Sequence, residues 1–229
     1  REVYTLLQPR FKETGFSVTI NDILAELEPL RQKVAPLVVD SSNFLLGFAE
    51  SEKNILIEGA QGALLDFDHG TFPFVTSSNP TIGGAFTGTG LSHKRVERVI
   101  GVTKAYCTRV GAGPFPTKLT DKVGEYLQVN GAEFGTTTGR KRDCGWLDVV
   151  ALRYAVKLNG VSELALTKLD VLGGLEKIKV AVSYKLVDGG VTFDFPEDTE
   201  ILSQVEPSYT VFEGWSGELS AKWEELPKQ

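Results

Sequence analysis

A periodic helix that runs directly into a short apolar segment is the feature that most constrains the fold of this sequence. The helix is predicted from Trp146 to Asn159, and Gly160 ends it. Its apolar face consists of Leu147, Val150, Ala151, Tyr154 and Ala155. Glu163 to Leu166 follow as a predicted buried strand, and Asn54 to Glu58 are predicted to form another. Helices that alternate with buried strands indicate an α/β fold with a mostly parallel central sheet and flanking helices.

The later part of the chain predicts a C-terminal antiparallel hairpin. Lys177 to Leu186 alternate between apolar and polar residues, as a half-exposed strand does. The turn Asp188-Gly189-Gly190 then leads into Val191-Thr192-Phe193.

Helical patterns dominate the first fifty residues. One helix is expected to start at Asn21 or Asp22 and to run to about Lys33, with Pro29 kinking or dividing it. A second is expected over residues 37–49. We therefore predict one α/β domain over residues 1–229, in which residues 1–36 form a helical lead-in.

Composition excludes several classes of protein. The 229 residues are 41% hydrophobic and 24% charged, which is typical of a globular chain and argues against disorder. No apolar run approaches the roughly 20 residues that a membrane helix needs. A net charge of −6 argues against nucleic acid as a partner. The two cysteines, Cys107 and Cys144, are too few for a disulfide scaffold and favour a reducing, cytoplasmic location.

Three polar loops lie at candidate carboxyl ends of strands, where sheets of this class bind ligands. They are Gly59–Gly62, Thr136–Arg142 and Thr167–Asp170. The first offers backbone N–H groups and one amide, or is a plain strand-to-helix turn. No Walker A phosphate loop occurs in the sequence.

A long glycine-rich stretch over residues 65–92 is expected to be a functional loop. It contains Asp66, Asp68 and His69, which could form a metal site or an acid–base pair. Because the chain has only two histidines, a histidine-based metal site has little support, and we expect His69 to have a structural hydrogen-bonding role.

The segment Thr167-Lys168-Leu169-Asp170 is the most specific short motif. It resembles the Asn-Lys-x-Asp guanine motif of GTPases, with Thr167 in place of Asn. A carboxylate accepts two hydrogen bonds at once, so Asp170 can accept from both N1–H and N2–H₂ of guanine while the lysine stem packs on the base. The alternative is that Asp170 caps a helix and Lys168 is simply solvated.

The loop from Gly135 to Arg142 holds three threonines and three cations between glycines. That composition suits capture of a phosphate or carboxylate, because Arg140 and Arg142 can each make bidentate contacts. A solvated charged turn remains the alternative.

Taken together, these segments resemble the adenylosuccinate synthetase family from about Leu37 to Trp215, in the family's order. The matching motifs are Glu58-Gly-Ala-Gln-Gly62, Leu65-Asp-Phe-Asp-His-Gly-Thr71, Val75-Thr-Ser-Ser-Asn79, Thr108-Arg-Val-Gly-Ala-Gly-Pro-Phe-Pro-Thr117, Thr137-Thr-Gly-Arg140, Gly145-Trp-Leu-Asp148 and Leu166-Thr-Lys-Leu-Asp-Val171. The resemblance implies a P-loop-NTPase-like α/β fold and a ligase of purine biosynthesis. That ligase joins IMP and L-aspartate at the expense of GTP, through a 6-phosphoryl-IMP intermediate.

The resemblance also assigns roles to residues of this chain. It implies IMP binding by Gln61, Thr76 and Arg140. It implies that one loop closes over the carboxylates of aspartate. The residues of that loop are Thr136, Thr137, Thr138, Gly139, Arg140, Lys141 and Arg142. It implies GTP contacts from Arg142, Lys168, Leu169 and Asp170.

The departures from the family's pattern matter equally. The family's Gly-Asp-Glu-Gly-Lys-Gly phosphate loop, its catalytic aspartate and histidine, and its carboxyl-terminal Ser-Thr-Gly-Pro segment have no counterpart here. We therefore expect a fragment truncated at both ends, with no catalytic residue and no metal ligand of its own. Ligands for Mg²⁺ are expected in the missing N-terminal segment. The fragment alone is expected to be inactive, and the complete enzyme to be a homodimer. The alternative is a non-catalytic guanine-nucleotide-binding module.

Overall fold

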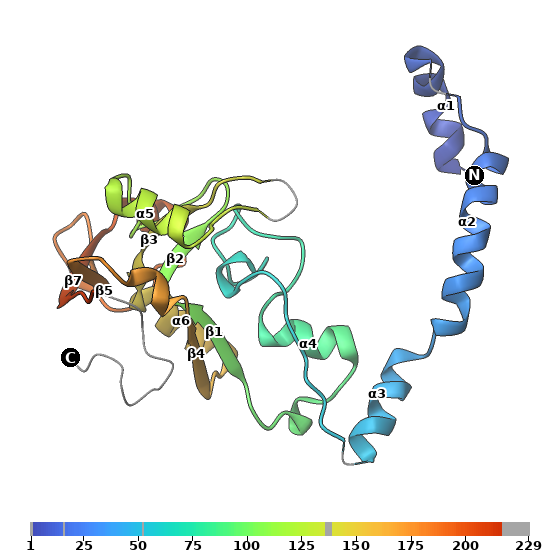
Figure 1. Cartoon of the computed structure of the whole chain (residues 1–229). Helices are drawn as coiled ribbons and strands as arrows, with labels where there is room; N and C mark the ends of the chain where they lie inside the picture. Colours follow the sequence, from blue (N-terminus) through green and yellow to red (C-terminus); the bar gives the residue numbers. More distant parts are fainter. Residues whose placement is uncertain (1, 16, 52, 136–138, 217–229) are drawn as a thin grey trace. The chain divides into compact units, whose positions relative to one another are not determined.

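The chain divides into two compact units, Arg1–Asn54 and Ile55–Gln229 (Figure 1). The computed structural model describes residues 2–15, 17–51, 53–135 and 139–216. The first unit is helical, and the second combines helices with two sheets. That both units form the single domain expected from the sequence stays a prediction.

The helical unit contains α1 (Glu2–Thr14), α2 (Ile20–Val34), the 3₁₀ turn η1 (Ala35–Leu37) and α3 (Ser41–Glu50). A capping box starts α2: Thr19 Oγ1 accepts from the Asp22 N–H at 3.2 Å, and Asp22 Oδ2 accepts from the Thr19 N–H at 2.8 Å. The cap is therefore Thr19 rather than Asn21 or Asp22. The prediction that Pro29 divides this helix is wrong, because α2 continues through it.

The α/β unit begins with irregular chain and short helices and ends in strands. The prediction that residues 65–92 form a loop is wrong in part, because a helix lies within them. The elements are η2 (Ala63–Leu65), α4 (Ile82–Thr89), η3 (His93–Arg95), β1 (Ile100–Lys104), β2 (Tyr106–Arg109), α5 (Lys122–Asn130), β3 (Asp143–Asp148), α6 (Val149–Asn159), β4 (Glu163–Thr167), η4 (Leu169–Leu172), β5 (Lys177–Lys185), β6 (Val191–Thr192), α7 (Thr199–Gln204) and β7 (Glu206–Glu213).

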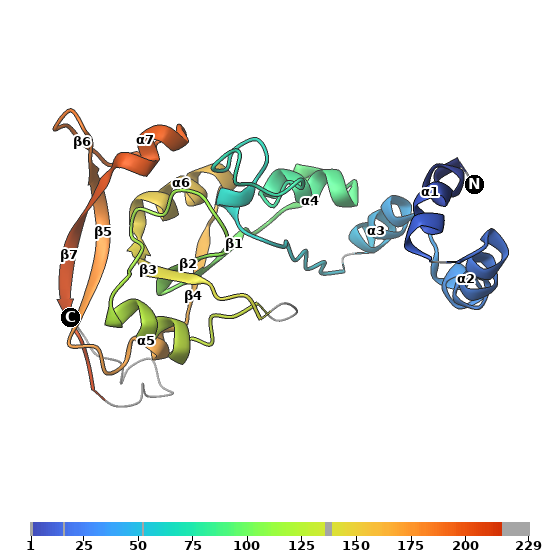
Figure 2. The ribbon, with the colours of Figure 1, turned by 90° about the horizontal axis from the view of Figure 1, so that it is seen from above.

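Two sheets organise this unit. β1 and β4 pair in parallel, from Ile100 opposite Glu163 to Lys104 opposite Thr167. The second sheet is mixed: β3 and β5 are parallel, while β2 pairs antiparallel with β3, and β5 pairs antiparallel with β6 and β7. Figure 2 shows β5, β6 and β7 as a ribbon beside the rest of the unit. The α/β class and the C-terminal hairpin are confirmed. Parallel pairing is confirmed for β1–β4 and β3–β5, whereas the other pairs of the second sheet are antiparallel.

The core of the unit lies around the second sheet. One buried cluster includes Tyr106, Leu127, Trp146 and Leu172, and a smaller one includes Val150, Tyr184 and Leu202. Helix α5 packs against β3, and α6 packs against β5. This core fixes the ends of β2, β3 and α5, from which the polar residues discussed below project.

Two predicted elements are placed differently in the structure. Asn54 to Glu58 form neither helix nor strand, and the Leu56 side chain is 91% exposed. An apolar run forms a strand only where a neighbour accepts its backbone hydrogen bonds, and within the described residues none pairs with it. The predicted helix from Trp146 starts instead at Val149, because Asp148 caps it by accepting from the Val150 and Ala151 N–H groups. Trp146 itself belongs to β3.

The strand predicted at Glu163 to Leu166 is confirmed as β4, but it is not buried in this chain. Leu164 and Leu166 are 50% and 52% exposed, because β4 pairs with β1 alone in a two-stranded sheet. In the part of the chain that the structure describes, no helix has the length and apolarity needed to cross a bilayer.

Candidate functional site

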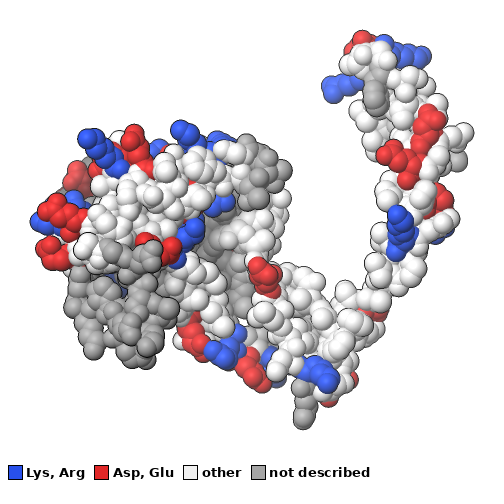
Figure 3. Space-filling view, in the orientation of Figure 1, with Lys and Arg blue, Asp and Glu red and all other residues white. Residues whose placement is uncertain are grey.

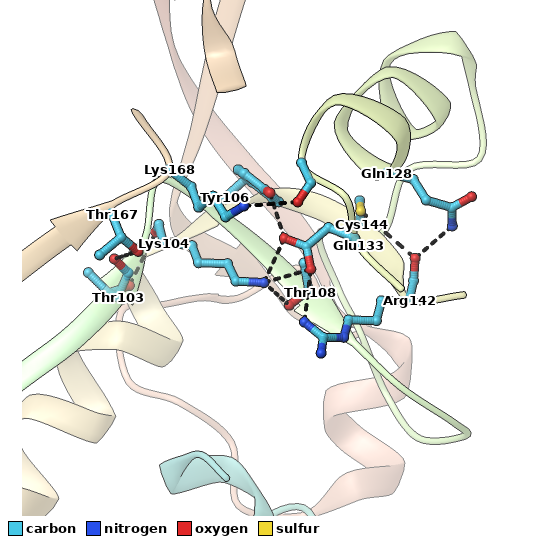
Figure 4. Close-up of polar contacts among 11 residues, drawn as sticks. Thr103, Lys104, Tyr106, Thr108, Gln128, Glu133, Arg142, Cys144, Thr167 and Lys168 are labelled. Atoms are coloured by element: carbon cyan, nitrogen blue, oxygen red, sulfur yellow. Dashed lines mark hydrogen bonds and ion pairs between the residues drawn. The ribbon is translucent and has the colours of Figure 1, made fainter. Parts of the chain in front are cut away.

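A buried carboxylate organises the polar residues at the ends of β1, β2 and α5. Glu133 is 1% exposed, and its carboxylate accepts from Lys104 Nζ at 2.7 and 2.8 Å and from Tyr106 Oη at 2.6 Å. Arg142 Nη1 donates to the same carboxylate at 3.0 Å. Figure 4 shows Lys104, Tyr106 and Arg142 pointing at Glu133 from different elements. One acid therefore joins two cations and a phenol.

The electrostatics keep this carboxylate charged. Burial by itself would raise the pKa of Glu133, but the hydrogen bonds from Lys104 and Tyr106 and the Lys104 charge outweigh it and hold the pKa below its usual value. Burial and the neighbouring Glu133 carboxylate raise the pKa of the Tyr106 phenol, so the hydroxyl stays protonated and donates. The Glu133 carboxylate is therefore charged and hydrogen-bonded at both oxygens at neutral pH.

The turn after α5 connects this cluster to the segment that follows β4. Lys168 Nζ donates to the Gly131 carbonyl at 3.0 Å, and Glu133 lies two residues further along the same turn. Ala132 between them has a φ of +51°, a left-handed conformation that turns the chain sharply. The turn over residues 131–133 thus contacts both Lys168 and Arg142, which lie 26 residues apart (168 − 142 = 26) in the sequence.

Comparisons with known proteins show the family of the chain. The family model described as adenylosuccinate synthetase matches residues 1–229. The chain belongs to the adenylosuccinate synthetase family. The relatives include the enzyme of Desulfitobacterium hafniense, 51% identical over 208 residues that cover 90% of this chain and 48% of the relative. The enzyme of Chlorobaculum tepidum is 56% identical over 198 residues, covering 86% and 45%.

A solved structure shows the same fold. The fully ligated adenylosuccinate synthetase of Plasmodium falciparum superposes with a TM-score of 0.89 at 40% identity, covering 98% of this chain and 55% of that one. The family resemblance seen in the sequence is thereby confirmed. The chain spans about half the length of the curated relatives that it matches.

The residues predicted to bind IMP lie in different local settings. Gln61 has a φ of +65°, in the irregular chain just before η2. Thr76 is half-buried; its N–H donates to the Leu65 carbonyl at 2.8 Å, and its Oγ1 lies 3.3 Å from Ser78 Oγ. The Arg140 guanidinium lies beside the Gly111 turn, since a Cβ built on Gly111 would be 3.9 Å from Arg140 Nη2.

The loop predicted to bind aspartate lies between α5 and β3, so the expectation that it follows a strand is wrong. Its base is closed by the Gly135 N–H, which donates to the Arg140 carbonyl at 2.8 Å, and by a bridge between Phe134 and Lys141. Gly139 has a φ of +64°, and Lys141 is exposed. Thr136, Thr137 and Thr138 lie outside the described residues. The described base presents Arg142 inward.

The predicted guanine segment does follow a strand. β4 ends at Thr167, Lys168 has a φ of +61°, and Leu169 and Asp170 open η4. The Asp170 side chain is exposed, and among the described residues it has no hydrogen-bond or ion-pair partner. A capping role would require its carboxylate to accept a backbone N–H. No such bond is present in the described part of the chain, and the base-binding hypothesis stays a prediction.

Sequence reasoning missed Glu133, Lys104 and Tyr106. Glu133 carried no signal except that it stands two residues before the glycine that opens the cation-rich loop. Lys104 could have been found from the parallel pairing of β1 and β4, because its register partner is Thr167 of the predicted guanine motif. The interpretation of His69 also stays a prediction; Asp66, fully buried beside it, accepts from the Asp68 and His69 N–H groups at 3.0 and 3.1 Å.

Proposed function

We propose that this chain supplies the substrate-binding half of an enzyme that joins IMP and L-aspartate at the expense of GTP. The products are adenylosuccinate, GDP and phosphate. Family membership supports the reaction class. The observation that carries the assignment to this chain is the turn over residues 131–133, which contacts Arg142 of the predicted aspartate loop and Lys168 of the predicted guanine segment. One turn that contacts both segments would hold the proposed aspartate and GTP sites close together.

In this proposal each loop has a defined task. The Asp170 carboxylate accepts from guanine N1–H and N2–H₂ while Lys168 and Leu169 lie along the base. Arg142, 33% exposed, holds a carboxylate of aspartate and faces GTP. Arg140 serves IMP and aspartate together, Gln61 and Thr76 contact IMP, and Thr136, Thr137, Thr138, Gly139 and Lys141 close over the amino acid. These residues bind and orient substrates, which accelerates a ligation chiefly by proximity.

We assign no Mg²⁺ ligand to the described part of this chain. Among those residues, no group of three or more His, Cys, Asp and Glu side chains could hold a metal ion. Phosphoryl transfer uses a cation to offset charge on the phosphates, and the family resemblance makes Mg²⁺ the expected one. No step is assigned to it through the residues described. We further propose a cytoplasmic homodimer; the free thiols of Cys107 and Cys144 agree with a reducing compartment.

The direct test is an assay of the complete gene product with GTP, IMP and L-aspartate in the presence of Mg²⁺. We expect adenylosuccinate to form in step with GDP, and omission of any one substrate to stop both. Replacement of GTP by ATP is the control for the guanine assignment. A protein that binds GDP tightly but forms no adenylosuccinate would support the alternative of a non-catalytic guanine-nucleotide module.

Two substitutions test the assignment of the loop. Arg140→Leu should raise the KM for IMP and aspartate, and Arg142→Leu should raise the KM for aspartate and GTP. Each removes a charge-assisted contact of about 1.5–3 kcal/mol, equivalent to about 10- to 150-fold. Steady-state kinetics with each substrate varied in turn separates the two patterns. Unchanged KM values for all three substrates would remove this loop from the active site.

A further inference from the structure

The Glu133 cluster distributes its hydrogen bonds unequally between its two cations. The Lys104 ammonium has three N–H donors, and three acceptors lie within reach: Glu133 Oε1 at 2.7 Å, Glu133 Oε2 at 2.8 Å and Thr108 Oγ1 at 3.0 Å. Lys104 is therefore saturated by the protein. In this arrangement Lys104 holds the Glu133 carboxylate in place and keeps it ionised.

Arg142, by contrast, has donors that the described part of the protein does not use. Its guanidinium has five N–H donors, and the structure uses one nitrogen, Nη1, for Glu133. Among the described residues, no other side chain accepts from this guanidinium. The cluster contains one negative and two positive side chains, so its net charge is +1 (2 − 1 = +1). Because protein acceptors take up the three donors of Lys104, the donors of the cluster that can reach a ligand are those of the partly exposed Arg142.

The backbone of Arg142 is held independently of the Glu133 side chain. The Arg142 N–H donates to the Glu133 carbonyl at 3.0 Å, and the Arg142 carbonyl accepts from Gln128 Nε2 at 2.8 Å. Removing the Glu133 charge would therefore free the guanidinium and leave the chain path of the loop base in place. This separation makes the side-chain contact testable.

We propose that Glu133 is the positioning residue of the ligand-binding loop: its buried carboxylate, braced by Lys104 and Tyr106, holds Arg142 through one nitrogen so that the remaining donors face an anionic substrate. The inference rests on the proposed function, in which that anion is a carboxylate of aspartate and Arg142 also serves GTP. Arginine binds such groups through a planar pair of donors, so a fixed guanidinium plane determines which anion geometry fits. An arginine that Glu133 did not hold could turn its guanidinium plane and would no longer select one anion geometry.

The test uses the complete gene product carrying Glu133→Gln, which keeps the shape of the side chain and removes its charge. We expect the KM for aspartate to rise about 10-fold and the KM for GTP to rise in the same direction, with the KM for IMP unchanged. Glu133→Asp keeps the charge but shortens the reach by one methylene, and it should give a smaller rise in the aspartate KM. Tyr106→Phe removes only the neutral brace and should change the aspartate KM least.

Glu163→Gln provides a matched control. It makes the same chemical change at an exposed ion pair with Arg98, at the opposite end of β1 and β4 from Lys104 and Thr167. Its three KM values should equal those of the parent. A thermal melt of each variant shows whether the protein is folded. If Glu133→Gln does not fold, the same KM values are compared for Glu133→Asp instead.

A double-mutant cycle with Arg142→Leu decides between the outcomes. If Glu133 acts through Arg142, adding Glu133→Gln to Arg142→Leu should change the aspartate KM less than about 2-fold. A full additional effect would overturn the positioning role. If Arg142→Leu raises the aspartate KM but folded Glu133→Gln or Glu133→Asp does not, the positioning inference is wrong and the proposed function stands. If Arg142→Leu itself has no effect, the placement of the loop in the active site is wrong.

Discussion

The two units of this chain form secondary structure for different reasons. In the helical unit, α2 carries Leu24, Leu27, Leu30 and Val34 on one face, and each is more than half exposed. No residue of α1, α2 or α3 is buried among those described. In the α/β unit, Leu127, Val150 and Tyr184 are 0% exposed. Caps and periodicity mark the helices of the first unit, whereas the second unit is built around a buried core; helices of this length are marginal in water without packing.

Charge does not distinguish the units. Figure 3 shows acidic and basic side chains interspersed over both. What distinguishes them is the burial of charge. The exposed Arg31–Glu28 pair of α2 has side chains that are 66% and 47% exposed, while Glu133 in the α/β unit is almost fully buried with its cations. An exposed pair contributes about 0–1 kcal/mol. A buried acid whose partner is removed costs considerably more. The candidate site residues, from Gln61 to Asp170, all lie in the α/β unit.

The largest expected effect tests the core of the α/β unit. Leu127→Ala should lower the free energy of unfolding by about 2–5 kcal/mol, because Leu127 is fully buried between α5 and the second sheet and its truncation leaves a cavity. Alanine keeps the backbone carbonyl that accepts from the Gly131 N–H at 2.9 Å, so the turn that holds Lys168 should keep this bond. Denaturant unfolding of the complete gene product gives the change in the free energy of unfolding. A loss below about 1 kcal/mol would mean that this core is not what stabilises the unit.

The next effect concerns nucleotide choice by the same unit. Asp170→Asn should lower kcat/KM for GTP by about 2–4 kcal/mol and improve the use of XTP. The carboxylate accepts from guanine N1–H and N2–H₂, whereas an asparagine amide faces N2–H₂ with a donor of its own. Xanthine carries a carbonyl at that position and suits the amide. The measurement is the ratio of kcat/KM for XTP to that for GTP in variant and parent.

The exposed Asp188, which caps the turn between β5 and β6 by accepting from the Gly190 N–H at 2.8 Å, is the matched control for Asp170. Asp188→Asn should leave the XTP to GTP ratio at its parental value. If Asp170→Asn lowers the use of both nucleotides equally, its carboxylate acts through stability and does not read the base.

Local patterns allowed α2, α3, α6 and the hairpin strands to be predicted, but not the other helices and not the boundaries against the core. The prediction for α6 was right from Val149 on and wrong at Trp146, because nothing in the helical periodicity shows that Trp146 pairs with Tyr106 across β2 and β3. The strand expected at Asn54 to Glu58 failed for a related reason. A strand is defined by its partner, and a run of three apolar residues does not reveal whether a partner exists.

Site residues that stand together in one short motif could be predicted from the sequence. Those that only the fold brings together were missed. Lys168 and Asp170 stand in one tetrapeptide, so their chemistry could be proposed directly. Glu133 meets Lys104 across 29 residues of sequence and Arg142 across nine. No spacing rule links those three residues. Only the pairing of strands and the turn after α5 bring them together.

The smallest expected effect lies in the helical unit and completes the comparison. Leu30→Ala repeats the chemical change made at Leu127, but on a side chain that is 51% exposed in α2. Little burial is lost and alanine has the higher helix propensity, so the free energy of unfolding should change by no more than about 0.5 kcal/mol. Denaturant unfolding of Leu30→Ala and Leu127→Ala under the same conditions checks the contrast. A loss of about 2 kcal/mol or more at Leu30 would show that the apolar face of α2 is covered in the complete protein, and that its stability depends on packing as in the α/β unit.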